Sequence, residues 1–244
     1  MNTSTGIHTE MRLNRPEHCE ETMYKRFAAV GAAIFAFALP ISGSPASGSP
    51  TPGSNEPPPP DKIVIDVVTV NGSGCPQGTA AVAVSPDNTA FTVTYSNYNA
   101  QVGVGAGPID FRKNCQLDLR VHVPQGFTYG IAQADYRGFA HLEAGATALE
   151  RARYYFQGDS PTTYIDHPFN GFLDDDWQET DSTDVGSVVF EPCGETRDFD
   201  INTELRVNAG TSDPKTTTSF IAMDSTDGSI TTTYHFAWKQ CPST

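Results

Sequence analysis

Alternation of apolar and polar residues is the pattern that most constrains the fold of this chain. It is clearest in residues 116–123 and 199–207. A period of two is typical of strands that bury one face. Similar stretches follow one another without a long amphipathic helix between them, at residues 63–70, 79–84, 89–95, 127–143, 147–156, 185–190, 219–223 and 230–238. Roughly ten strands of this kind predict an all-β domain, either a single antiparallel β-sandwich or a flattened barrel.

One predicted strand is unusually long. Residues 127–143 place small residues, among them Gly138, on one face, where a second layer can approach closely. The other face, which includes Tyr129, is more polar than a core accepts. A glycine inside a strand often marks a bulge or bend, and we therefore expect one at Gly138.

An export signal lies near the N-terminus. Lys25 and Arg26 precede an apolar run over residues 27–39, which is shorter than the roughly 20 residues that a membrane span requires. Small residues follow, so we expect cleavage after Ala46 and a secreted, extracellular protein without a membrane span. Met23 is an alternative start, because the residues before it are mostly polar.

Composition divides the chain into three segments. We expect a signal region at 1–46 that is removed, a Pro/Ser-rich linker at 47–62 and the β-sandwich domain at 63–244. The linker offers almost nothing to bury, and its prolines favour extended backbone. Asn71 begins an Asn-Gly-Ser acceptor sequence and is predicted to carry an N-linked glycan.

Four cysteines remain after the expected cleavage, and an even number in an oxidising compartment predicts two disulfides. Three pairings are possible. We favour Cys75 with Cys115 and Cys193 with Cys241, because each pair then encloses enough chain for a β-meander. A zinc site is disfavoured, since the chain has no Cys-x-x-Cys motif.

The chain is acidic, with a formal net charge of −14 at pH 7. Such a charge repels nucleic acid and anionic lipid, and no run of basic residues offsets it. We therefore expect no nucleic-acid partner.

Several short motifs carry a family resemblance. Residues 75–78 read Cys-Pro-Gln-Gly, and residues 114–116 read Asn-Cys-Gln ahead of a predicted strand. With residues 154–158 and 238–241, they resemble a family of secreted fungal and bacterial proteins known only as a domain of unknown function. The resemblance covers about residues 65–241. It implies secretion and paired cysteines, and it implies no activity.

Residues 157–184 lack a regular pattern and are predicted to form a long loop, the kind of segment that often binds ligands. Within it, Trp177 stands among acidic residues and is expected to be exposed. Trp177, Tyr154 and Tyr164 are the candidate ligand-binding residues, since aromatic rings can stack on sugars. The acidic run makes calcium the one conceivable cofactor, through Asp174, Asp175, Asp176 and Asp181. A solvated acidic surface explains the run equally well.

The sequence gives less support to metal binding, serine catalysis, phosphate binding or glycan cleavage. The domain has four histidines, His122, His141, His167 and His235, of which only His141 has a ligand-type neighbour on its own strand face, Glu143. No nucleophilic-serine motif occurs, and the glycine-rich residues 103–107 are predicted to form a flexible turn, because no helix follows to bind a phosphate. Paired carboxylates for glycan cleavage are available on strands, at Asp118, Asp135, Glu143 and Glu150.

Two functions from different classes remain open. The first is a secreted, non-enzymatic protein that binds a glycan or a protein at a cell wall or host surface, through the 157–184 segment and nearby strand edges. The second is a secreted polysaccharide hydrolase or lyase. A hydrolase requires two carboxylates that converge in a cleft, whereas a binding protein requires only an accessible surface.

Overall fold

The computed structural model describes residues 56–183, 187–223 and 231–242. The expected signal region and the linker as far as residue 55 lie outside the described residues. Within the described part, no helix is long and apolar enough to cross a membrane. The strands are β1 (Val64–Asn71), β2 (Ala80–Val84), β3 (Ala90–Tyr95), β4 (Asn99–Gly103), β5 (Arg112–His122), β6 (Phe127–Leu142), β7 (Thr147–Phe156), β8 (Ile165–Asn170), β9 (Leu173–Ser182), β10 (Phe199–Asn208), β11 (Thr218–Ala222) and β12 (Thr232–Gln240).

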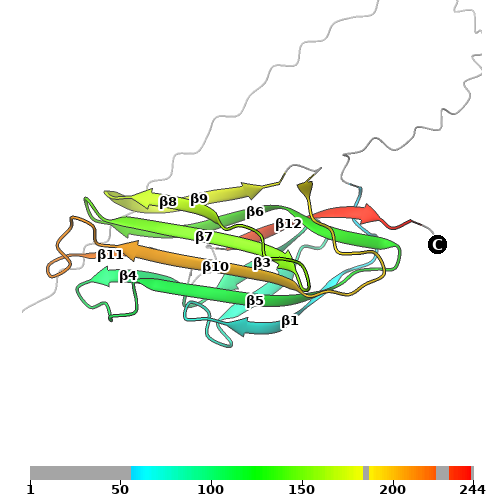
Figure 1. The fold of residues 1–244 in the computed structure, drawn as a ribbon, viewed down its shortest axis with the longest axis horizontal. Coiled ribbons are helices and arrows are strands. Elements are labelled where there is room, and N and C mark those ends of the chain that lie inside the picture. The colour runs from blue at the N-terminus through cyan, green and yellow to red at the C-terminus, as the bar shows by residue number, and fades with distance from the viewer. Residues whose placement is uncertain (1–55, 184–186, 224–230, 243–244) are drawn as a thin grey trace, which may run out of the picture. The chain divides into compact units, whose positions relative to one another are not determined.

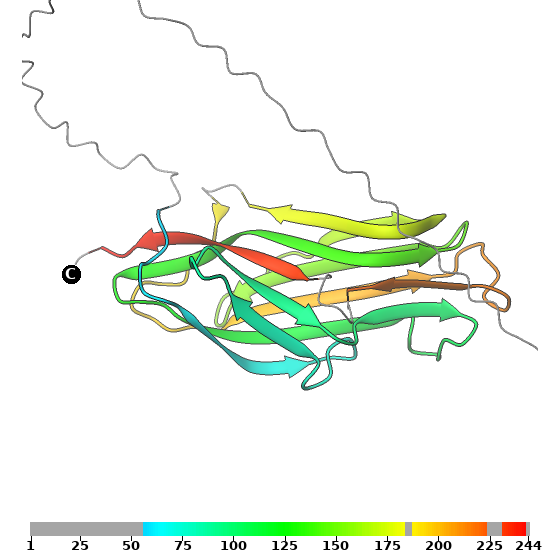
Figure 2. The same ribbon diagram turned by 180° about the vertical axis from the view of Figure 1, so that it is seen from behind.

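These strands form two antiparallel sheets. One sheet has the order β1-β5-β10-β7-β8, and the other has the order β2-β3-β12-β6-β11-β4, with β9 paired to β6. Figure 1 shows β5, β10 and β7 running side by side, and Figure 2 shows β3 and β12 from the opposite side. The structure confirms the antiparallel β-sandwich. The flattened barrel is wrong, because both sheets are open.

Aromatic side chains fill the space between the sheets. Tyr129 makes edge contacts with Phe156 and Phe236, and Phe91 stacks on Tyr234. All but Phe236 are almost completely buried. Large rings contribute much apolar area each, so a few of them can fill the layer of a sandwich of this size.

Two disulfides reinforce the sandwich, with the pairing favoured from the sequence. Cys75 and Cys115 are bonded with their Cα atoms 5.3 Å apart, and Cys193 and Cys241 with theirs 5.8 Å apart. The first bridge is buried in the core, whereas Cys193 is exposed.

The long strand β6 contains a bulge, but not at Gly138. Gln133 pairs with His235 and Ile131 pairs with Phe236 on β12, so Ala132 is the extra residue. A one-residue insertion moves the following side chains to the opposite face. This explains why Tyr129, expected on the polar face, lies in the core: the odd-numbered residues point inward before the bulge and the even-numbered ones after it.

Gly138 instead makes room for a neighbouring ring. A Cβ atom there would lie 2.3 Å from Cζ2 of Trp177 and 2.2 Å from the carbonyl oxygen of Ala222. We therefore expect Gly138→Ala to lower the free energy of unfolding by about 1–3 kcal/mol, the usual cost of overpacking. Urea titration of the secreted domain measures it. Gly78→Ala is a poor control, because Gly78 has a positive φ that alanine rarely adopts. Ala144→Ser, on an exposed turn, is the better control and should leave the free energy of unfolding unchanged. An unchanged midpoint for Gly138→Ala would contradict this reading.

Two expectations about secondary structure are wrong, and one strand was not predicted. The predicted loop at 157–184 contains strands β8 and β9. Residues 99–103 form the unpredicted strand β4, and the expected turn follows directly at Val104 and Gly105. Residues 187–190 of the predicted strand 185–190 belong to no strand. The strands of the 157–184 segment were missed because they lie at sheet margins, where few of their side chains are buried.

Candidate ligand-binding face

The outer face of the five-stranded sheet carries most of the polar side chains of its strands. Strand alternation sends every second residue of β5, β7 and β10 away from the core. The strand registers then place these side chains in rows that cross the sheet. Two neighbouring rows differ sharply in how well their charges are paired.

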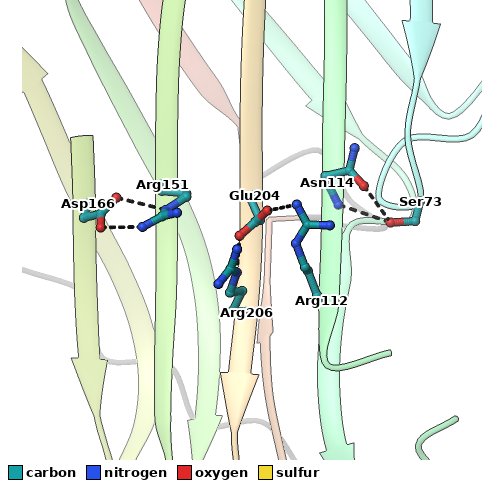
Figure 3. Close-up of polar contacts among 7 residues, drawn as sticks. All are labelled: Ser73, Arg112, Asn114, Arg151, Asp166, Glu204 and Arg206. Carbon is teal, nitrogen blue, oxygen red and sulfur yellow. Dashed lines mark hydrogen bonds and ion pairs between the residues drawn. The ribbon is translucent and has the colours of Figure 1, made fainter. Parts of the chain in front are cut away.

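In the first row each charged side chain contacts one of opposite charge, and Figure 3 shows the row crossing from β8 to β5. Arg151 donates to both carboxylate oxygens of Asp166, at 3.0 and 2.6 Å. Glu204, which is buried, accepts from both Arg206 and Arg112. At the end of this row, the Ser73 hydroxyl donates to Oδ1 of Asn114 at 3.1 Å.

The second row contains an arginine without such a partner. The guanidinium of Arg153 lies over the rings of Tyr164, at 4.5 Å from the centroid, and of Tyr155, at 5.9 Å. Its Nε is buried and has no hydrogen-bond partner among the described residues. Arg151 contacts the Tyr164 ring as well, at 5.0 Å. The result is a layered group of two rings and two guanidinium planes.

Uncharged amides continue this second row. Asn202 on β10 pairs in register with Arg153, and Gln116 on β5 pairs with Asn202. Asn202 also donates to the Tyr155 hydroxyl at 3.5 Å. Asn71, the predicted glycosylation site, is exposed on β1 opposite Gln116. A glycan there would lie at the margin of the same face, and its presence stays a prediction.

Two carboxyl groups border the row. Asp118 and Asp200 are direct partners on β5 and β10. Burial, and then the neighbouring Asp198, raise the pKa of Asp118, while burial and then Asp118 raise the pKa of Asp200. Oδ1 of Asp118 is buried without a hydrogen-bond partner in the described structure. A buried donor on Arg153 and a buried acceptor on Asp118 therefore both lie at this face without a partner among the described residues.

One of the three candidate aromatic residues does not lie where the sequence suggested. Trp177, expected to be exposed, is only 7 % exposed and packs on Phe169 at 5.1 Å between ring centroids. Its strand, β9, turns this residue inward, and its acidic neighbours point out. Tyr154 lies on the inner face of β7, where its hydroxyl contacts Tyr136. Tyr164, at 38 % exposure, lies over Arg153 on the outer face of the five-stranded sheet.

The four aspartates proposed for calcium do not surround a common point. Asp174, Asp175 and Asp176 are exposed at the start of β9, whereas Asp181 is buried near its end. At about 3.3 Å per strand residue, Asp181 lies roughly 20 Å from Asp174. No cluster of three acidic, histidine or cysteine side chains suited to a metal occurs among the described residues.

The four carboxylates considered for hydrolysis are also dispersed. Asp118 lies on the outer face of the five-stranded sheet, Asp135 is bonded to Thr180 and His235, and Glu150 is buried in the core. Cavities of about 630, 520 and 380 Å³ in the described structure are lined by other residues and not by Asp118, Asp135, Glu143 or Glu150.

Each of the four histidines has a carboxylate partner. His122 contacts Asp66 at 2.7 Å, and His141 contacts Asp174 at 2.9 Å. His141 also lies 3.7 Å from Glu143, the pair noted in the sequence. His167 contacts Asp181 and His235 contacts Asp135, both at 2.8 Å.

Sequence reasoning missed the central residues of the face. Arg153, Asn202 and Gln116 lie on strands that were predicted correctly, yet their proximity depends on the order and register of those strands. The alternation within residues 147–156 could have identified Arg151, Arg153 and Tyr155 as sharing one face. No local signal indicates that β10 is the neighbour.

Comparisons with known proteins place the chain among secreted proteins of unassigned function. A family model described as "Domain of unknown function (DUF4360)" matches residues 61–241. An "Uncharacterized secreted protein" of Arthroderma benhamiae (strain ATCC MYA-4681 / CBS 112371) is 35 % identical over 184 residues, which cover 75 % of this chain and 74 % of the relative.

One solved structure is also similar over part of its length. It is the enzymatically active domain of the bacteriophage CBA120 tailspike protein 4, with 11 % identity and a TM-score of 0.21. The match covers 74 % of this chain and 19 % of the tailspike chain. This likeness is too low to support an argument.

Proposed function

Since the chain belongs to the DUF4360 family of unknown function and is secreted, we propose from its geometry that it is a non-enzymatic extracellular binding protein whose ligand is a glycan. The glycan lies on the outer face of the five-stranded sheet, over Tyr155, Arg153 and Tyr164. The observation that carries the proposal is the Arg153 guanidinium, which two tyrosines hold in place and which has no carboxylate partner within the described part of a chain of net charge −14.

The composition of the face supports a sugar over a protein as ligand. A sugar ring has an apolar face that stacks on aromatic rings and a rim of hydroxyls that both donate and accept. Arg153 and Asn202 supply donors, and Asp118 supplies an acceptor. The core of a protein interface is, in contrast, poor in charged groups. The acidic surface also disfavours a strongly anionic polymer, so the expected glycan is neutral.

Retention on insoluble polysaccharides tests the proposal. The secreted domain is incubated with chitin, cellulose or β-1,3-glucan, and the bound fraction is measured after centrifugation. We expect retention on one of them, and a loss of roughly tenfold in affinity for each of Tyr155→Ala and Tyr164→Ala, since a stacked ring contributes about 1.4 kcal/mol. Arg153→Gln is expected to weaken retention similarly.

Phe172→Ala is the matched control, because Phe172 is an aromatic residue at 69 % exposure outside this face. It should leave retention unchanged. Equal binding of the double tyrosine variant and the parent would contradict the proposal. Release of soluble reducing sugar would instead indicate the hydrolase alternative, for which Asp118 and Asp200 would be the carboxyl pair.

A further inference from the structure

The two strands at one side of the sandwich, β8 and β9, are joined by side chains and not by a backbone ladder. Strand β8 ends the five-stranded sheet, and β9 pairs with β6 of the other sheet. Figure 1 shows them close together. His167 on β8 contacts Asp181 at 2.8 Å and Glu179 at 3.5 Å, both on β9. We call this junction the β8–β9 seam.

A buried carboxyl group lies directly behind the seam. Glu150 on β7 is the register partner of His167, and its exposure is 0 %. Neither of its carboxyl oxygens has a hydrogen-bond partner among the described residues. Burial, and then the nearby Asp181 and Glu179, raise the pKa of Glu150 well above its ordinary value. Such a group is tolerated in a core only while it is protonated.

The groups that face Glu150 do not offset a negative charge. Asp181 is buried, its pKa is raised first by that burial, and it accepts a hydrogen bond from Tyr154. The remaining titratable neighbours are the buried hydroxyls of Tyr136 on β6, Tyr234 on β12, Tyr95 on β3 and Tyr98 after it. Outside the sheet, Asp166 on β8 is paired with Arg151.

We propose that the β8–β9 seam is a proton-operated latch, which is closed in acid and opens as the pH rises. In acid, Glu150 is neutral, and the contacts of His167 with Asp181 and Glu179 hold β9 to β8. At higher pH, Glu150 and Asp181 both lose their protons and repel each other in a medium that screens them poorly. The strands can relieve this repulsion by separating, because no backbone ladder between β8 and β9 has to break.

The latch has one consequence that rests on the proposed function. Tyr164, a stacking residue of the ligand-binding face, immediately precedes β8. Separation of β8 would draw Tyr164 away from Arg153, so glycan retention should fall as the pH rises. The test of the latch itself requires no ligand, and the two proposals can therefore fail independently.

Hydrogen exchange read by mass spectrometry tests the latch on the ligand-free domain. Exchange is measured from about pH 5 to about pH 8 and corrected for the intrinsic pH dependence of amide exchange. We expect protection of β8 and β9 to fall by up to about tenfold per pH unit for each of the two protons, on Glu150 and Asp181, that opening releases. Protection of β5 and β10 should not fall in this way as the pH rises.

Two variants make the result specific. Glu150→Gln cannot ionise and should retain protection of β8 and β9 at high pH, and Asp181→Asn should do the same if Glu150→Gln does not fold. His122→Gln disrupts a His–Asp contact of 2.7 Å between β5 and β1, away from β8 and β9, and should leave the seam unchanged. The latch would be overturned if protection of β8 and β9 did not depend on pH, or if it fell with pH to the same extent as in all other strands. A fall in both seam variants as large as in the parent would also overturn it.

Discussion

Replacement of both Cys75 and Cys115 by alanine is expected to lower the free energy of unfolding by about 4 kcal/mol. The bridge spans a sequence separation of 40 residues, so its loss returns considerable freedom to the unfolded chain. Both cysteines are also buried in the core, where the lost sulfur atoms leave poorly filled space. Urea unfolding of the secreted domain, followed by fluorescence, measures the loss.

The second bridge is the matched control. Cys193 and Cys241 span a separation of 48 residues, so the chain-entropy effect of removing them is nearly the same. Cys193 is exposed, however, and its loss leaves no cavity in the core. The double alanine variant at this bridge should therefore be less destabilised than the variant at the buried bridge. An equal or greater loss at Cys193 and Cys241 would show that burial of the first bridge adds nothing.

The domain is expected to be most stable in mildly acidic solution and to lose stability towards neutral and alkaline pH. Five carboxyl groups have pKa values that burial raises: Glu150, Asp181, Glu191, Asp118 and Asp200. Above their ordinary pKa values, the unfolded chain releases protons that the folded chain retains. Each fully retained proton then lowers the free energy of unfolding by about 1.4 kcal/mol per pH unit, up to the folded-state pKa.

Other carboxyl groups cause the free energy of unfolding to decrease again in stronger acid. Hydrogen bonds from Ser85 and Lys113 lower the pKa values of Asp87 and Asp110, respectively. Their contributions are present above the ordinary pKa of aspartate and are lost as the pH falls through the lowered values. Stability should therefore pass through a maximum at about pH 4–5 and decline on both sides.

Urea midpoints measured between about pH 4 and about pH 8 test this dependence. Glu150→Gln removes the largest buried contribution, so its midpoints should decline less steeply than those of the parent above about pH 5. Unlike the exchange test of the seam, this measurement reports unfolding of the whole domain. A parent domain that becomes more stable from about pH 5 to about pH 8 would contradict the expectation.

The sequence predicted the parts of the fold that depend on local pattern. Strands β5, β7 and β10 were predicted because most of their inner residues are apolar and their outer residues are polar. The alternation in the sequence therefore indicates which face of each strand is buried. The disulfide pairing followed from the number and spacing of four cysteines.

The parts that depend on contacts between distant strands were not predicted. Strand β9 resembled a loop because Asp174 and Asp176 point outward while buried Asp181 is held by His167, a contact that composition cannot reveal. Trp177 was judged by its acidic neighbours, although Gly138 on β6 provides the space for its ring. The Arg153 group likewise requires Tyr164 to reach it from beyond the β7–β8 turn.

A direct measurement of glycan binding at the outer face tests the central claim. In ¹⁵N-labelled protein, the Nε–H of Arg153 and the side-chain amides of Asn202 and Gln116 give resolvable signals. They are followed during titration with a soluble oligosaccharide of the retained polysaccharide. The account predicts that these signals shift together and saturate at one affinity, while the amide of Phe172 stays unchanged. Saturable shifts confined to other surfaces, with the Arg153 signal unmoved, would contradict it.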